Sequence, residues 1–168
     1  VGGRKQCCVL CFGNTGFDFN TLYAAYLALA REVHKPKTPM QQFVEIYSSM
    51  IDTVKSLGPT PVLMSLPVLD PERFFNYVTQ GLDKSNVLKW LGGTVLSIDR
   101  WHGMYNMAVF RLGAMKKVPV IDITSVFLEK KNYSEYICED GIHPNERGHG
   151  LIEEAIMEFL QERRVALL

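Results

Sequence analysis

The chain has 168 residues, of which 47% are hydrophobic and 21% are charged, and 18 Lys and Arg residues balance 18 Asp and Glu residues. This length suits one domain with a sizeable core, and the composition is ordinary for a globular protein. The absence of a net charge argues against nucleic acid or an acidic membrane surface as a partner. No apolar run approaches the roughly 20 residues of a membrane-spanning helix.

The first half of the chain alternates between strand-like and helix-like patterns. A short apolar run over residues 7–12 predicts a strand. The apolar residues between 40 and 57 recur at helical spacing, which predicts an amphipathic helix that is stopped by Gly58 and Pro59. A second apolar run, over residues 61–66, predicts another strand.

The second half continues the alternation. Asp70 followed by Pro71 is typical of a helix N-terminus, so a short helix is predicted to begin there. The remaining predicted elements, in chain order, are a short helix at 87–91, a longer helix around 101–112, a third strand at 118–123 and a final helix with apolar residues from 151 to 160.

Strands separated by helices indicate crossover connections, which predict an α/β fold with a parallel sheet and helices on both faces. No repeat or linker divides the sequence, so residues 1–168 are expected to form one domain. Sites in such folds lie at the carboxyl ends of the strands. The loops after residues 12 and 66, and the loop that contains Asp140 and His143, are expected at that end of the sheet.

Asp140 and His143 are the strongest candidates for chemistry. A carboxylate three positions before an imidazole can hydrogen-bond to it, fix its tautomer and stabilise it when it is protonated, as in the triads of hydrolases. The same two residues could instead satisfy backbone groups in a loop that caps the final helix. Local spacing leaves both interpretations open.

The residues around this pair resemble the last signature block of the SGNH/GDSL hydrolases. That block is Asp-x-x-His, often followed by Pro, with a Gly shortly afterwards and a closing helix; Asp140, His143, Pro144 and Gly148 match it. Other matching segments are the first strand with its Gly/Asn-rich loop, the long helix, and residues 61–67, 100–106 and 120–123. The resemblance extends over roughly residues 9–160.

The resemblance implies a three-layer, flavodoxin-like fold and a serine-type hydrolysis of an ester, such as an O-acyl or acetyl group on a carbohydrate, without a metal or cofactor. His143 would act as general base towards the serine and then as general acid towards the leaving alkoxide, and Asp140 would orient it. An Asn side chain would help to hold the oxyanion. Here the family's Gly-x-Asn-Asp block reads Gly-Asn-Thr-Gly, with Asn14 one place early. Asn14 and Thr15 are therefore both candidates, and a simple turn is the alternative.

The family's Gly-Asp-Ser block, which carries the nucleophile, does not occur in this sequence. None of the eight serines follows a strand in the turn that would expose an activated hydroxyl. The family's sheet has the strand order 2-1-3-4-5, so the nucleophile and two N-terminal strands are expected upstream of this chain. The strand at 7–12 would then have an open edge, which a partner chain or a second copy is expected to cover. A non-catalytic module that binds carbohydrate is the alternative function.

Other residues are given structural roles. The four cysteines (Cys7, Cys8, Cys11 and Cys138) are interpreted as free thiols rather than a metal site, which favours a reducing, cytoplasmic compartment. His102 is expected to be a packed or surface residue, with a place in a substrate pocket as the alternative. Asp122 is expected to cap the segment that follows it.

Overall fold

The structure is a computed structural model that describes residues 7–10, 36 and 38–165. Three strands form a parallel sheet in the order β1 (Cys7–Leu10), β2 (Thr60–Met64) and β3 (Val120–Ile121). In the register, Val9 lies beside Val62, and Leu63 lies beside Val120. The predicted parallel sheet is confirmed.

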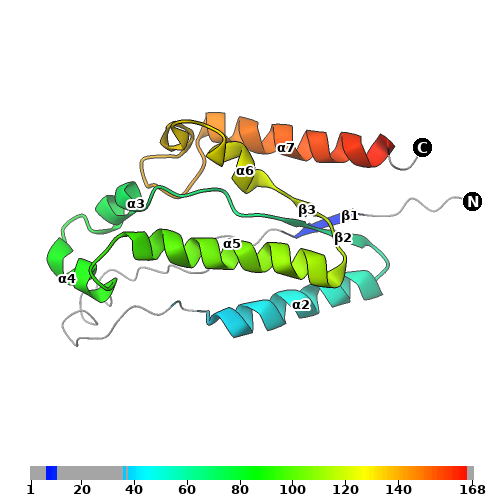
Figure 1. Cartoon of the computed structure of the whole chain (residues 1–168), viewed down its shortest axis with the longest axis horizontal. Helices are drawn as coiled ribbons and strands as arrows, with labels where there is room; N and C mark the ends of the chain where they lie inside the picture. Colours follow the sequence, from blue (N-terminus) through cyan, green and yellow to red (C-terminus); the bar gives the residue numbers. More distant parts are fainter. Residues whose placement is uncertain (1–6, 11–35, 37, 166–168) are drawn as a thin grey trace, which may run out of the picture.

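Helices cover both faces of this sheet (Figure 1). Because alternate residues of a strand point to opposite faces, Leu63 and Val62 belong to different cores. Leu63 packs with α2 (Met40–Ser56) and α5 (Leu96–Lys116), whereas Val62 packs with α6 (Ile123–Leu128) and α7 (Glu146–Val165). The α/β arrangement with a helical layer on each face is therefore confirmed.

A further cluster lies beyond the carboxyl ends of β2 and β3, at the left of Figure 1. It joins α3 (Pro71–Val78) and α4 (Lys84–Trp90) to the start of α5 through buried Phe74, Trp90 and Ile98. Asp70 is the N-cap of α3, as predicted, and its carboxylate accepts a hydrogen bond from the Arg73 N–H at 3.0 Å. The chain runs from the end of β2 straight into α3, so α3 lies close to the carboxyl end of the sheet, where a site is expected.

Two predicted strand boundaries are wrong. The second strand ends at Met64, and Ser65 lies just beyond it rather than inside it. The third strand is limited to Val120–Ile121, because Asp122 accepts hydrogen bonds from the N–H groups of Thr124 and Ser125 and so starts α6. Asp122 thus caps the next segment, as expected. The sequence pattern missed α6 itself and the short 3₁₀ helix η1 (Tyr133–Tyr136).

Candidate functional site

The candidate site is the loop of residues 137–145, called the Asp140 loop below, which connects η1 to α7. Ile137 and Pro144 pair in an isolated antiparallel bridge, and the Cys138 N–H donates to the His143 carbonyl at 2.7 Å. These contacts close the loop into a narrow hairpin. Asp140 and His143 therefore face each other across its tip.

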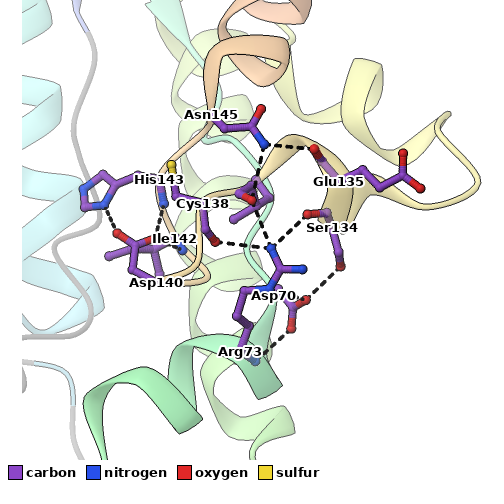
Figure 2. A network of polar contacts seen from close by, with 10 residues as sticks. Asp70, Arg73, Ser134, Glu135, Cys138, Asp140, Ile142, His143 and Asn145 are labelled. Atoms are coloured by element: carbon purple, nitrogen blue, oxygen red, sulfur yellow. Dashed lines mark hydrogen bonds and ion pairs between the residues drawn. The ribbon is translucent and has the colours of Figure 1, made fainter. Parts of the chain in front are cut away.

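Asp140 and His143 form a close pair (Figure 2). The Oδ2 atom of Asp140 lies 2.5 Å from Nδ1 of His143, and Oδ1 accepts from the N–H groups of Ile142 at 3.0 Å and His143 at 3.1 Å. The Asp140 side chain is 21% exposed, whereas the His143 side chain is 71% exposed. Nε2 of His143 hydrogen-bonds none of the residues that the structure describes. One ring nitrogen is held and the other is open.

The surroundings of Asp140 favour its charged form. Burial by itself would raise the pKa of this carboxyl, but the hydrogen bonds from the His143 ring and from the Ile142 and His143 N–H groups lower the pKa below its ordinary value. Asp140 is therefore ionised at neutral pH. An ionised carboxylate on Nδ1 keeps the proton on that nitrogen and leaves Nε2 as the basic atom.

Asp140 is not itself the N-cap of α7, although its Oδ1 does accept from two backbone N–H groups of the loop, as the alternative interpretation expects. The residue before α7 is Asn145, whose side-chain oxygen accepts from the Gly148 N–H at 3.1 Å, in the manner of an N-cap. The Asn145 amide also donates to the Glu135 carbonyl at 2.9 Å. Because Asn145 fills this role, the Asp140 carboxylate remains committed to its own turn and to His143.

Gly141 is the residue that lets this loop approach α3. Its φ is +81°, and a Cβ atom at this position would lie 2.3 Å from the Phe74 nitrogen and 2.8 Å from the Asp70 carbonyl oxygen. Those atoms are backbone, so they cannot move aside cheaply. The Gly inside the Asp-x-x-His block thus has a packing reason as well as a conformational one.

The other predicted site residues are less informative. Asn14 and Thr15 lie outside the described residues, as does Cys11. Cys138, which belongs to the Asp140 loop, is a free, half-buried thiol. Within the described part of the chain, no group of three or more His, Cys, Asp or Glu residues is placed to hold a metal ion.

Ser65 also lies at the carboxyl end of the sheet, but its hydroxyl is already hydrogen-bonded within the protein. The side chain is fully buried, and Oγ accepts from the N–H groups of Ile123 at 2.8 Å and Thr124 at 3.0 Å. Asn106 completes the arrangement by accepting from the Leu66 N–H and donating to the Thr124 hydroxyl, both at 2.8 Å. These side chains join the ends of β2 and β3. The buried, hydrogen-bonded Ser65 hydroxyl is not placed to attack a substrate.

His102 lies beside a cavity that the sequence did not reveal. The cavity measures about 430 Å³ and is bounded by α5, α6 and the segment after β2. Burial lowers the pKa of His102 to about 4, so the ring is neutral at physiological pH. His102 is only 8% exposed, in line with a packed side chain, and it also lines this cavity. None of the cavity's lining residues belongs to the Asp140 loop.

Comparison with known proteins extends the fold assignment. No family model and no curated protein matches the chain. Among solved structures, the chain is similar to the crystal structure of the lipase/acylhydrolase from Enterococcus faecalis, with a TM-score of 0.52 and 17% sequence identity. The chain shares the fold of that lipase/acylhydrolase. The match covers 92% of this chain and 60% of that one, so the chain spans less than two thirds of the length of that lipase/acylhydrolase.

Among the residues that the structure describes, no helix is both long enough and apolar enough to cross a membrane.

Proposed function

We propose that this chain carries the acid/base part of a serine-type ester hydrolase of the SGNH/GDSL kind. The observation that carries the proposal is the Asp140–His143 pair, with its 2.5 Å contact to Nδ1 and its open Nε2. The likeness of the fold to a lipase/acylhydrolase supports the same reaction class. The nucleophilic serine is supplied by a residue outside these 168.

The proposed reaction uses the two ring nitrogens of His143 differently. Nε2 takes the proton from the serine hydroxyl as the serine oxygen bonds to the ester carbonyl carbon, and Asp140 stabilises the imidazolium that forms. The bond from that carbon to the alcohol oxygen then breaks, and the leaving alkoxide takes the proton from Nε2. Water repeats the sequence on the acyl-serine, which releases the acid and restores the serine hydroxyl.

Asn14 is the proposed side-chain donor to the oxyanion, with Thr15 as its alternative. A preorganised amide donor at that position stabilises the negative charge that develops on the carbonyl oxygen. The substrate proposed is a small O-acyl or acetyl ester, including one on a carbohydrate. Replacing Asn14 with Ala is expected to lower kcat by about 10²- to 10³-fold if its amide serves in this way.

The test is the hydrolysis of an aryl acetate by the protein that includes the residues preceding this chain. We expect turnover in the wild type and its loss in H143A, whereas H149A, which changes an exposed His on α7, should retain it. Turnover that survives in H143A would contradict the proposal. The 168-residue chain alone is expected to show no serine-dependent turnover.

A non-catalytic binding module on the same fold is the second candidate function. The Thr15 and Gly16 that stand where the family has Asn and Asp favour it, because they alter the oxyanion loop. In that case an acylated sugar would bind equally well to the wild type and to H143A, and neither would hydrolyse it.

Strand β1 leads to a proposal about association. In the described residues it pairs with β2 on one side, and its other edge has no described strand. An unpaired edge is a template for another strand, so we expect the 168-residue chain to form a dimer or larger assembly. Light scattering after size-exclusion chromatography measures this, and a stable monomer would count against it.

A further inference from the structure

We propose that Arg73 is a positioning residue for the Asp140–His143 pair. Arg73 holds the backbone that precedes Asp140, at Cys138. Asp70, at the start of the same helix α3, holds the backbone that follows it, at Gly141. The effect on catalysis rests on the proposed function; the effect on the geometry of the pair does not.

The Arg73 guanidinium gathers three backbone carbonyls from the segment that precedes Asp140 (Figure 2). The two N–H groups of its Nη1 are shared among the carbonyl oxygens of Ser134 at 2.9 Å, Ile137 at 3.0 Å and Cys138 at 3.2 Å. Carbonyl oxygens that converge in this way repel one another unless a cation lies between them. The charged guanidinium supplies that cation together with hydrogen bonds of fixed geometry.

Asp70 fixes the other components of the arrangement. Its carboxylate accepts from the Ser134 hydroxyl at 2.8 Å and lies 3.7 Å from Nε of Arg73. Its backbone N–H donates to the Gly141 carbonyl at 2.8 Å. The first turn of α3 is thus bonded to Cys138 on one side of Asp140 and to Gly141 on the other.

This arrangement explains how an exposed loop can keep a short side-chain contact. The Asp140 backbone must keep one position relative to His143 for the carboxylate to bind Nδ1 and the two N–H groups of its own turn at the same time. Attachment at Cys138 and Gly141 removes the freedom of both flanks, so little conformational entropy remains to be lost when the pair forms. Without Arg73 the three carbonyls lose their shared cation. Each then keeps one other hydrogen bond, from the Ile137 N–H at 3.3 Å, the Asn145 amide at 3.4 Å or the Gly141 N–H at 3.1 Å, so the backbone that precedes Asp140 is held less firmly.

The first test measures the pKa of Asp140 by NMR of its carboxyl carbon in the 168-residue chain. In R73M we expect this pKa to rise towards its ordinary value, because the hydrogen bonds that lower it become less occupied. R73K keeps the charge but loses the Nε that lies 3.7 Å from the Asp70 carboxylate, so the Asp140 pKa in R73K should lie between those of the wild type and R73M. A pKa unchanged in both variants would overturn the proposal.

The matched control is R147M. Arg147 also serves the same region, since it lies 3.3 Å from the Glu135 carboxylate and over the Tyr136 ring, but it does not contact either flank of Asp140. Its removal should leave the Asp140 pKa unchanged, and an equal rise in R147M would overturn the proposal. If R73M does not fold, R73K carries the test: its Asp140 pKa should lie above that of the wild type, and an unchanged value would overturn the proposal.

Kinetics of the protein with its preceding residues give the second test. R73M is expected to lower kcat on aryl acetate by about 10- to 100-fold, as misplacement of a catalytic group does, with KM changed less than about twofold. A shifted Asp140 pKa in a protein that never hydrolyses the ester would refute the proposed function and leave the positioning role standing. An unshifted pKa in an active enzyme would refute the positioning role alone.

Discussion

Two aspartates at the same end of the sheet, Asp122 and Asp140, accept almost the same backbone hydrogen bonds but bind different side chains. Oδ1 of Asp122 accepts from the N–H groups of Thr124 and Ser125, and Oδ1 of Asp140 accepts from those of Ile142 and His143. The difference lies in the second oxygen. That of Asp122 binds the Ser125 hydroxyl at 2.6 Å, whereas that of Asp140 binds an imidazole whose other nitrogen is open.

The comparison shows that two turns whose backbone is bonded in the same way can differ in what their side chains leave available. Around Asp122, the hydroxyl and amide groups of Ser65, Thr124 and Asn106 bond to one another and to the strand ends. Around Asp140, the hydrogen bonds stop at a ring that is 71% exposed. A group that still has an unused basic atom is the one that can act on a substrate.

The largest expected difference between the two regions is catalytic. D140N should lower kcat on aryl acetate by roughly 10⁴-fold, because an amide cannot stabilise the imidazolium and favours the wrong tautomer. D122N should change kcat little, because Asn caps a helix about as well as Asp. Steady-state kinetics of both variants, in the protein with its preceding residues, measure this difference. Equal losses of kcat in D140N and D122N would contradict the distinction between the two aspartates.

The pair and the sheet were predictable, but the support around the pair was not. Asp140 and His143 are three positions apart, so their contact follows from spacing. The contact of Arg73 with Cys138 joins positions 65 residues apart in the chain, and no local pattern records it.

Helix α6 was hidden for a different reason. Its start continues the apolar run of β3, and hydrophobicity alone does not separate Ile121 from Ile123. The capping geometry of Asp122 does. The role of Asn145 was within reach of the sequence, since Asn directly before a helix is a common N-cap.

The next expected effect is on stability. S65A removes the acceptor of the buried Ile123 N–H, which should lower the free energy of unfolding by about 1–3 kcal/mol. S125A, at an exposed position, should change it by less than about 0.5 kcal/mol. Urea unfolding measures both, and a reversed order would show that the Asp122 region is not held together as described.

The smallest expected effect is a pH dependence that belongs to the Asp140 region. The pKa of Asp140 in the folded chain is below its ordinary value of 3.8, so its ionised form stabilises the fold above that pH. This contribution is lost as the pH falls from 3.8 through the lower folded pKa. The difference in unfolding free energy between the wild type and D140N should therefore shrink as the pH falls below about 4. A difference that grows on acidification would contradict the sign of the shift.

The most direct test of the central claim is to locate the nucleophile with a serine-directed phosphonate. The protein with its preceding residues is labelled, digested and analysed by mass spectrometry. We predict an adduct on a serine outside the 168 residues, and its loss in H143A, because His143 would no longer take the hydroxyl proton. An adduct on one of the eight serines of this chain, or labelling undiminished in H143A, would contradict the account.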